Sequence, residues 1–146
     1  MRHILSLAYA SRNTNFDKVI NFEGEDIRIT QFSTGFHFNL TKDLIKKYDG
    51  ECDLICLSGI PHRIHLPRKD IVNPTSNKLK LSSEQTPILD GEILEEVYLP
   101  WMLRQVYLKK PELIANKKIS LYCGSQFIHC LDVIKEFAGD IRLCDP

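Results

Sequence analysis

The clearest hydrophobic pattern in the chain is an uninterrupted apolar run over residues 54–57, which stops at Ser58 and Gly59. Continuous apolar runs of this length are typical of strands buried on both faces, as in a parallel sheet covered by helices. In such sheets ligands bind at the carboxyl ends of the strands, where the following loop exposes backbone N–H groups. The run therefore predicts a buried strand and places one wall of a ligand site at Ser58 and Gly59.

The other apolar and polar positions predict strands and helices in alternation. Strands are expected at residues 3–10, 18–22, 26–32, 63–66, 87–89, 118–123 and 141–144. Helices are expected from residue 39 or 41 to 48, over 92–108 with a bend at Pro100, and over 112–115 and 127–137. These elements predict an α/β fold of three layers, Rossmann-like or flavodoxin-like. Its mostly parallel sheet is flanked by helices and has an antiparallel hairpin near its amino-terminal edge.

One long stretch lacks apolar periodicity. Residues 67–85 are mainly polar, and Asn73-Pro74-Thr75-Ser76-Asn77 is the strongest turn-forming sequence in the chain. Clusters of this composition are typical of surface loops. We therefore expect residues 67–85 to form a loop that is the most mobile part of the domain.

The length and charge of the chain limit its possible binding partners and its cellular location. At 146 residues the chain is expected to be one α/β domain over 1–146, or the amino-terminal part of a longer two-domain protein. Its 19 basic and 19 acidic residues cancel, which argues against a nucleic acid or an anionic membrane as the partner. No apolar run approaches the ~18 residues of a membrane-spanning helix, and the first residues do not resemble a signal peptide. These features predict a cytoplasmic protein.

The cysteines and histidines do not form a metal-binding pattern. The five cysteines, which contain no C-x-x-C pair, are Cys52, Cys56, Cys123, Cys130 and Cys144. Buried free thiols are therefore expected. His62 and His65 form an H-x-x-H pair, but no carboxylate nearby completes a zinc ligand set. No metal cofactor is expected.

A second candidate site segment ends the apolar run at 87–89. Asp90 and Gly91 follow this run directly. Asp90 would either contact a polar ligand or cap the following helix, since acids are favoured at helix amino termini. If both strands are parallel neighbours, the segments after Leu57 and Leu89 lie at the same sheet edge. Arg12, after the first strand, would be a third wall that pairs with an anion, or a surface residue.

The last strand–helix–strand unit has the spacing of a dinucleotide-binding fold. Gly124 and Ser125 lie between its first strand and its helix, and Asp145 follows its second strand. In such folds the turn binds a pyrophosphate and the acid binds a ribose hydroxyl. Gln126 and His129 stand where the G-x-G-x-x-G pattern requires glycine. A plain strand–helix connection is therefore the alternative interpretation.

Several segments, taken in order, resemble bacterial proteins labelled quinate 5-dehydrogenase-like or predicted dehydrogenase. The matching segments are SLAYASR at 6–12, residues 22–35, YDGECDLICLSGI at 48–60, TPILDG at 86–91, and residues 118–145. They differ from the family at Ser58, which replaces the first glycine of a Gly-Gly pair, and at Gln126-Phe127. The matching segments lack the lysine and aspartate pairing of shikimate-type dehydrogenases.

The resemblance implies an enzyme. The chain would be the substrate-facing amino-terminal domain of an NAD(P)-dependent dehydrogenase-like protein that acts on a small hydroxy or keto acid. The substrate-binding candidates are Ser58, Gly59, Asp90, Gly91 and Arg12. The cofactor-binding candidates, for NAD(P), are Gly124, Ser125 and Asp145.

The rival hypothesis is a non-catalytic module on the same fold, which senses a small molecule or mediates assembly. It fits the absence of an evident general base or nucleophile in the sequence pattern. Both hypotheses expect a small-molecule ligand and are compatible with an oligomer.

Overall fold

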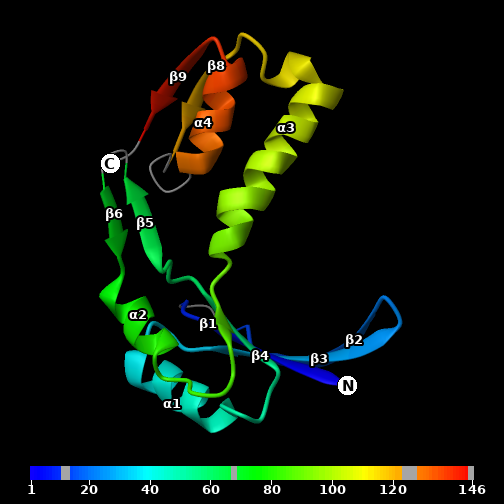
Figure 1. Cartoon of the computed structure of the whole chain (residues 1–146), viewed down its shortest axis with the longest axis vertical. Coiled ribbons are helices and arrows are strands. Elements are labelled where there is room, and N and C mark those ends of the chain that lie inside the picture. Colours follow the sequence, from blue (N-terminus) through cyan, green and yellow to red (C-terminus); the bar gives the residue numbers. More distant parts are fainter. Residues whose placement is uncertain (11–13, 67–68, 123–127, 145–146) are drawn as a thin grey trace. The chain divides into compact units, whose positions relative to one another are not determined.

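The computed structural model describes residues 1–10, 14–66, 69–122 and 128–144 (Figure 1). The chain divides into two compact units. Unit 1 consists of Met1–His62 and Asn73–Gly91, and unit 2 consists of Arg63–Val72 and Glu92–Pro146.

The described residues of unit 1 form one sheet and two helices. Its elements are β1 (Arg2–Ala8), β2 (Phe16–Phe22), β3 (Glu25–Ser33), α1 (Phe38–Tyr48), β4 (Leu54–Ser58), α2 (Pro74–Lys80) and β7 (Ile88–Leu89). The five strands lie in the order β2-β3-β1-β4-β7. All neighbouring pairs are parallel except β2 and β3, which form an antiparallel hairpin. The α/β class, the mostly parallel sheet and the edge hairpin are thus confirmed.

The hairpin turn follows from its two central residues. Glu23 and Gly24 have φ angles of 51° and 85°. Two successive positive φ angles define a type I′ turn, whose twist matches that of the flanking strands. The turn therefore brings β2 directly against β3, with Phe22 opposite Glu25.

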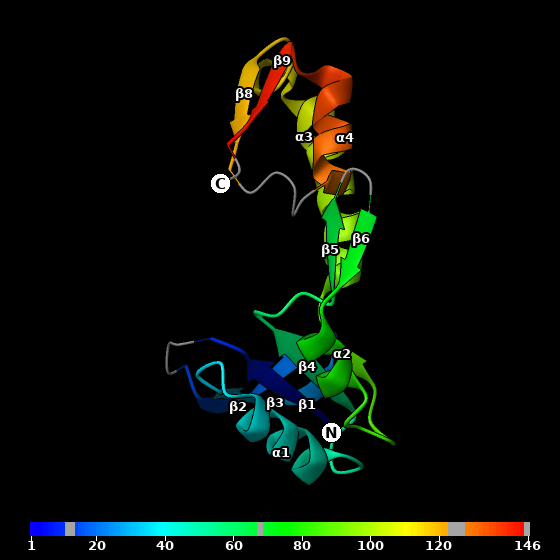
Figure 2. The same cartoon turned by 90° about the vertical axis from the view of Figure 1, so that its left-hand side faces the viewer.

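The core of unit 1 lies on one face of the sheet. The buried side chains that form it are Leu5, Leu7, Ile45, Ile55, Leu57, Ile60 and Leu79. Helices α1 and α2, which supply Ile45 and Leu79, pack side by side (Figure 2). Within unit 1 the described residues therefore form two layers, and the expected third layer is not seen there.

The expectation that β4 is buried on both faces was wrong. Ile55 and Leu57 are buried beneath the helices, whereas Leu54 and Cys56, which alternate with them, are only half-buried. Side chains alternate between the two faces of a strand, so helices on one face bury only every second residue.

The expectation of a loop over residues 67–85 was also wrong. The chain forms β6 (Lys69–Val72) and then α2. The turn-forming sequence is the amino terminus of α2, because the Asn73 side chain accepts the backbone N–H groups of Thr75 and Ser76. Pro74 occupies the first turn, where a missing N–H is harmless.

In the part of unit 2 that the structure describes, there are two small sheets and several helices. Its elements are β5 (Arg63–Leu66), β6, the π-helical turn η1 (Leu94–Tyr98), α3 (Leu99–Lys109), the 3-10 turn η2 (Pro111–Leu113), β8 (Lys118–Leu121), α4 (Ile128–Phe137) and β9 (Asp140–Leu143). Strands β5 and β6 are antiparallel, and β8 and β9 are parallel. Helices α3 and α4 contact each other, and Tyr107 stacks on Phe137 at 3.8 Å between ring centroids.

The irregularity predicted at Pro100 takes the form of a π-turn just before it. The Leu99 N–H donates to the Leu94 carbonyl, one residue further back than in an α-helix. Pro100 has no N–H with which to continue the α-helical ladder. The wider turn allows the helical path to continue past the proline.

Candidate functional site

The carboxyl ends of four parallel strands meet at one edge of the unit 1 sheet. Ala8 pairs with Ser33 on one side and with Ser58 on the other. Cys56 pairs with Leu89. Ser58-Gly59 and Asp90-Gly91 therefore follow neighbouring strands at the same edge, where the sequence placed them.

This edge includes a change of direction in the chain path. From β1 the chain continues to β2 and β3 on one side, whereas from β4 it continues to β7 on the other. Open α/β sheets bind ligands at the strand ends where the chain reverses direction in this way. Strand β4, with Ser58 at its end, is one of the two strands at this point.

A charged contact at this edge joins Asp90 to Lys80. Lys80 Nζ lies 2.8 Å from Asp90 Oδ2, and the Asp90 side chain is only 6% exposed. Lys80 comes from the last turn of α2 and is 24% exposed. A nearly buried carboxylate thus holds an ammonium group at the carboxyl edge of the sheet. Sequence reasoning found Asp90 but missed Lys80, because the segment that contains it was expected to be a loop.

The two glycines at this edge have different surroundings. Gly59 has a φ of +80°, and a Cβ added there would lie 2.6 Å from the carbonyl oxygen of Tyr9. The Tyr9 N–H donates to the Ser58 carbonyl at 2.8 Å. Gly59 therefore allows the ends of β1 and β4 to approach closely. Gly91 has a φ of +84° with nothing within 4 Å of an added Cβ, so it only supplies a turn.

A network of hydroxyl and amide groups lies on the sheet face away from α1 and α2. Ser6 Oγ donates to Gln31 Oε1 at 3.0 Å, and Gln31 Nε2 donates to the Thr14 carbonyl and hydroxyl oxygens. The Ser33 hydroxyl lies 2.8 Å from that of Thr14, and the Ser33 N–H donates to Asn15 Oδ1. These bonds fix residues 14–15 against the ends of β1 and β3.

Another hydrogen-bonded assembly positions Asp90. The Asp49 carboxylate accepts the Ser83 hydroxyl and the backbone N–H groups of Glu84, Gln85 and Thr86. These donors hold the Asp49 pKa well below its ordinary value, with the Ser83 bond as the largest cause. Asp49 ends α1, so it anchors the segment that leads into β7 and Asp90.

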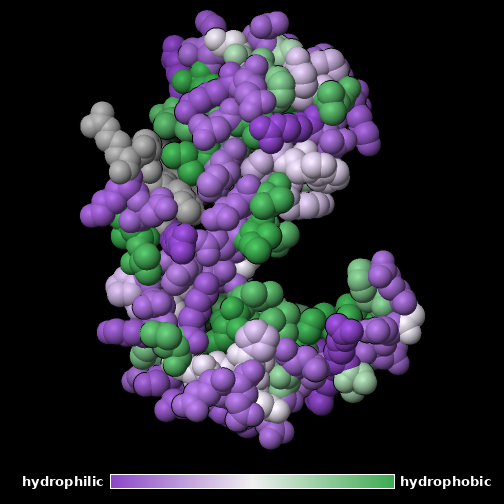
Figure 3. All heavy atoms as spheres, in the orientation of Figure 1, coloured by the Kyte–Doolittle hydropathy of each residue, from purple (hydrophilic) through white to green (hydrophobic). Residues whose placement is uncertain are grey.

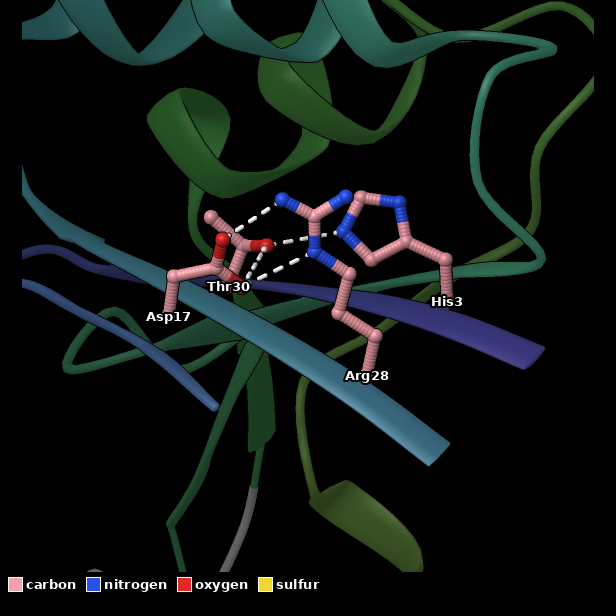
Figure 4. Close-up of polar contacts among 4 residues, drawn as sticks. All are labelled: His3, Asp17, Arg28 and Thr30. Atoms are coloured by element: carbon pink, nitrogen blue, oxygen red, sulfur yellow. Dashed lines mark hydrogen bonds and ion pairs between the residues drawn. The ribbon is translucent and has the colours of Figure 1, made fainter. Parts of the chain in front are cut away.

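A separate polar cluster lies near the amino end of β1 (Figure 4). The Asp17 carboxylate accepts two bonds from the Arg28 guanidinium and one from Thr30, and the Thr30 hydroxyl lies 2.8 Å from His3 Nε2. The Arg28 bond is the main reason that the Asp17 pKa falls to about 2. This cluster links β1, β2 and β3 near the amino end of β1, rather than at the carboxyl edge where open α/β sheets bind ligands.

A shallow hollow at the opposite edge of the sheet is also less suited to a ligand. It has a volume of about 430 Å³ and is lined by Met1, Arg2, Glu25 and Asp26. Arg2 and Glu25 form an ion pair at 3.3 Å. This hollow lies at the amino ends of β1 and β3, away from the edge where open α/β sheets bind ligands.

The thiol of Cys56, near the carboxyl edge of the sheet, is not activated. Cys56 lies beside Ser6 in the sheet, and burial raises the pKa of its thiol. A raised pKa keeps sulfur in the weakly nucleophilic thiol form. Among the described residues, no group of three or more His, Cys, Asp and Glu side chains is placed to hold a metal ion.

Some predicted site residues cannot be placed. Arg12, Gly124, Ser125 and Asp145 lie outside the described residues. The parallel βαβ unit predicted to contain the last three is present, because β8 and β9 are parallel and α4 follows β8 in the chain. No described helix of the chain is long and apolar enough to span a membrane.

The comparisons with known proteins identify a family. No curated protein matches the chain. A family model described as a domain of unknown function, DUF8753, matches residues 3–90. This match begins in β1, ends at Asp90, and includes Ser58 and Lys80. Because it covers more than half of the 146 residues, the chain belongs to the DUF8753 family.

Proposed function

We propose that unit 1 binds a small hydroxy or keto acid at the carboxyl edge of its sheet, as the substrate-facing part of an NAD(P)-dependent dehydrogenase-like protein in the cytoplasm. The observation that carries this proposal is the Lys80–Asp90 pair, with 2.8 Å between Nζ and Oδ2 and a nearly buried carboxylate. A lysine positioned by a carboxylate is suited to exchange a proton with a hydroxyl or carbonyl oxygen. The balanced charge of the chain fits a small-molecule partner rather than a nucleic acid.

The two members of the pair would have different roles. Lys80 would donate a hydrogen bond to the reacting oxygen, lose a proton to it during reduction and regain one during oxidation. Asp90 would hold the Lys80 ammonium group in place. The exposed Ser58 hydroxyl at the end of β4 would bind a further oxygen of the ligand.

The strand order supports the finer fold assignment on which the proposal depends. The parallel strands of unit 1 follow the order β3-β1-β4-β7, which is second-first-third-fourth along the chain. This is the order at the start of a flavodoxin-like, doubly wound sheet. Such folds bind ligands at the carboxyl edge of the sheet, the edge at which Asp90 follows β7.

NAD(P) is the cofactor that this proposal assigns to the chain, and it would exchange a hydride with the substrate carbon when bound. The parallel β8–α4–β9 unit has the topology of a dinucleotide-binding unit. The first turn of α4 contains no acidic residue, which suits a helix amino terminus near a phosphate. Gly124, Ser125 and Asp145 are the residues proposed to hold the cofactor.

Calorimetric titration of the full chain with quinate, shikimate, lactate and malate tests the proposal. At least one acid should bind, and Lys80→Met or Asp90→Asn should weaken its affinity tenfold or more, because each removes the ion pair that positions the ammonium group. Lys78→Met is the matched control, since Lys78 is exposed on the same helix. Folding of each variant is checked by circular dichroism.

The titration and oxidation results can each support or refute the proposal. Equal loss of affinity in Lys78→Met and Lys80→Met would show that only general charge matters. Binding that is unchanged in both Lys80→Met and Asp90→Asn would refute this site. Oxidation of the bound acid with NAD or NADP, lost in Lys80→Met, would establish the catalytic part.

One observation favours the rival function, a module for assembly. The sheet face away from α1 and α2 carries exposed apolar side chains in unit 1, including Phe16, Ile20, Phe22 and Leu89. Exposed apolar surface of this kind often marks an interaction site. Failure of every small acid to bind, with NAD(P) present, would favour this function.

A further inference from the structure

The outermost strand of the unit 1 sheet has an unusually apolar exposed edge. Strand β2 is the end strand of the sheet formed by the described residues, and each of its seven residues is exposed. Figure 3 shows hydrophobic side chains, in green, along the β2–β3 hairpin. Those of β2 are Phe16, Val19, Ile20 and Phe22. Long apolar edges are normally protected, because their free backbone groups pair with other strands.

The hairpin turn determines which backbone groups of β2 point outward. A two-residue type I′ turn is closed by a hydrogen-bonded pair, here Phe22 and Glu25. Hydrogen-bonded and non-hydrogen-bonded pairs alternate along an antiparallel ladder. The N–H and carbonyl groups of Asp17, Val19 and Asn21 therefore point away from β3. These three residues are available to another strand.

We propose that β2 pairs with β2 of a second copy of this chain, antiparallel, about a twofold axis at Val19. Val19 then faces Val19 of the second copy, and Asp17 faces Asn21. All of these residues present outward backbone groups, so both strands supply matching donors and acceptors. Such self-complementary contacts are what twofold symmetry requires.

The side chains fit this register. Phe16 faces Phe22 in a non-hydrogen-bonded pair, where side chains approach most closely and aromatic pairs are favourable. Lys18 faces Ile20, and its ammonium group already lies over the ring of Phe16. No pair of like charges is opposed. The pairing also joins the apolar faces of the two sheets.

The neighbouring registers oppose like charges. Moving the axis to Lys18 places the two Lys18 side chains directly opposite each other. Moving it to Ile20 places Asp17 opposite Glu23. Like charges directly opposite each other destabilise a strand pair. Charge therefore selects the register centred on Val19.

Sedimentation velocity of the full chain over a range of concentrations tests the proposal. The wild type should form a dimer as concentration rises. Val19→Glu and Val19→Lys should each stay monomeric, because each opposes two like charges at the axis. An equimolar mixture of the two variants should recover the dimer, since Glu and Lys then face each other. Leu81→Glu, at an exposed residue of unit 1 outside the sheet, is the control that should still dimerise.

Amide hydrogen exchange gives an independent readout. The outward N–H groups of Asp17, Val19 and Asn21 should become protected as concentration rises, whereas those of Lys18 and Ile20 should be protected throughout by β3. Because Val19 is exposed, circular dichroism should show that its variants remain folded. The proposal does not depend on the proposed function.

Three sedimentation outcomes overturn the proposal. These are a wild type that remains monomeric at every concentration, a dimer that persists in Val19→Glu and Val19→Lys, and a mixture that fails to recover the dimer. Protection of the outward amides only after addition of an extended peptide from another protein would also overturn it, in favour of a different partner.

Discussion

The Asp49 carboxylate accepts the backbone N–H of Thr86 at 2.8 Å, across a separation of 37 residues in the sequence. Two further N–H groups and the Ser83 hydroxyl converge on the same carboxylate. In the reverse direction, the Gly50 N–H donates to the Thr86 hydroxyl at 2.8 Å. The end of α1 and the segment before β7 are thereby fixed to each other.

Asp49→Ala should lower the melting temperature of the chain and loosen the segment that leads to Asp90. The reason is that three N–H groups and one hydroxyl lose their common acceptor. Thermal denaturation followed by circular dichroism measures the effect. Asp49→Asn, which keeps one acceptor oxygen, should lie between wild type and Asp49→Ala. A melting temperature of Asp49→Ala equal to that of wild type would contradict the anchoring role.

The Asp17–Arg28 pair predicts a loss of stability in acid. Asp17 has a pKa of about 2 in the folded chain, against an ordinary value of 3.8. An acid with a lowered folded pKa stabilises the fold above its unfolded pKa, and this contribution is lost as the pH falls from 3.8 towards 2. In Asp17→Asn the unfolding free energy should therefore fall less steeply over this window. Urea denaturation at several pH values measures the slope.

The control for this acid effect is Asp43→Asn, which removes an exposed carboxylate of α1. Its pH profile should follow that of the wild type more closely than that of Asp17→Asn. Identical slopes in the wild type and Asp17→Asn would show that the ion pair does not contribute to acid sensitivity.

Gly59→Ala should destabilise the fold by about 1–3 kcal/mol, the usual range for a residue held in an unfavourable backbone conformation. The added Cβ would also lie 2.6 Å from the Tyr9 carbonyl oxygen. Gly91→Ala is the matched control, because Gly91 has a similar φ but open space around it. Chemical denaturation of both variants should show the larger loss for Gly59→Ala. An equal loss would mean that the contact with Tyr9 adds nothing.

Asn73→Ala should cost about 1 kcal/mol of stability, as is typical for the loss of a helix N-cap. Its side chain accepts the N–H groups of Thr75 and Ser76, which alanine cannot do. Asn77→Ala, in the same helix, should be neutral or slightly stabilising, since alanine favours helix formation. Urea denaturation compares the two. A larger loss in Asn77→Ala than in Asn73→Ala would contradict the capping assignment.

Local patterns in the sequence were enough to predict most of unit 1. The apolar run at 54–57 predicted β4, and the strands expected at 18–22 and 26–32 predicted the β2–β3 hairpin, because strand periodicity acts between near neighbours. The same reasoning brought Ser58-Gly59 and Asp90-Gly91 to one edge, since parallel neighbours end on the same side. The local pattern gave a wrong prediction at Asn73-Pro74, because these residues favour both a turn and the start of a helix.

Only the tertiary structure decided how these elements use their side chains. The ion pair between Lys80 and Asp90 joins the end of α2 to the residue that follows β7, and no local pattern encodes this approach. The burial of β4 on one face follows from α1 and α2 lying side by side. The need for glycine at position 59 comes from the carbonyl of Tyr9, the residue that follows the neighbouring strand β1. Local propensity sets which elements form, whereas packing between distant segments sets which groups meet.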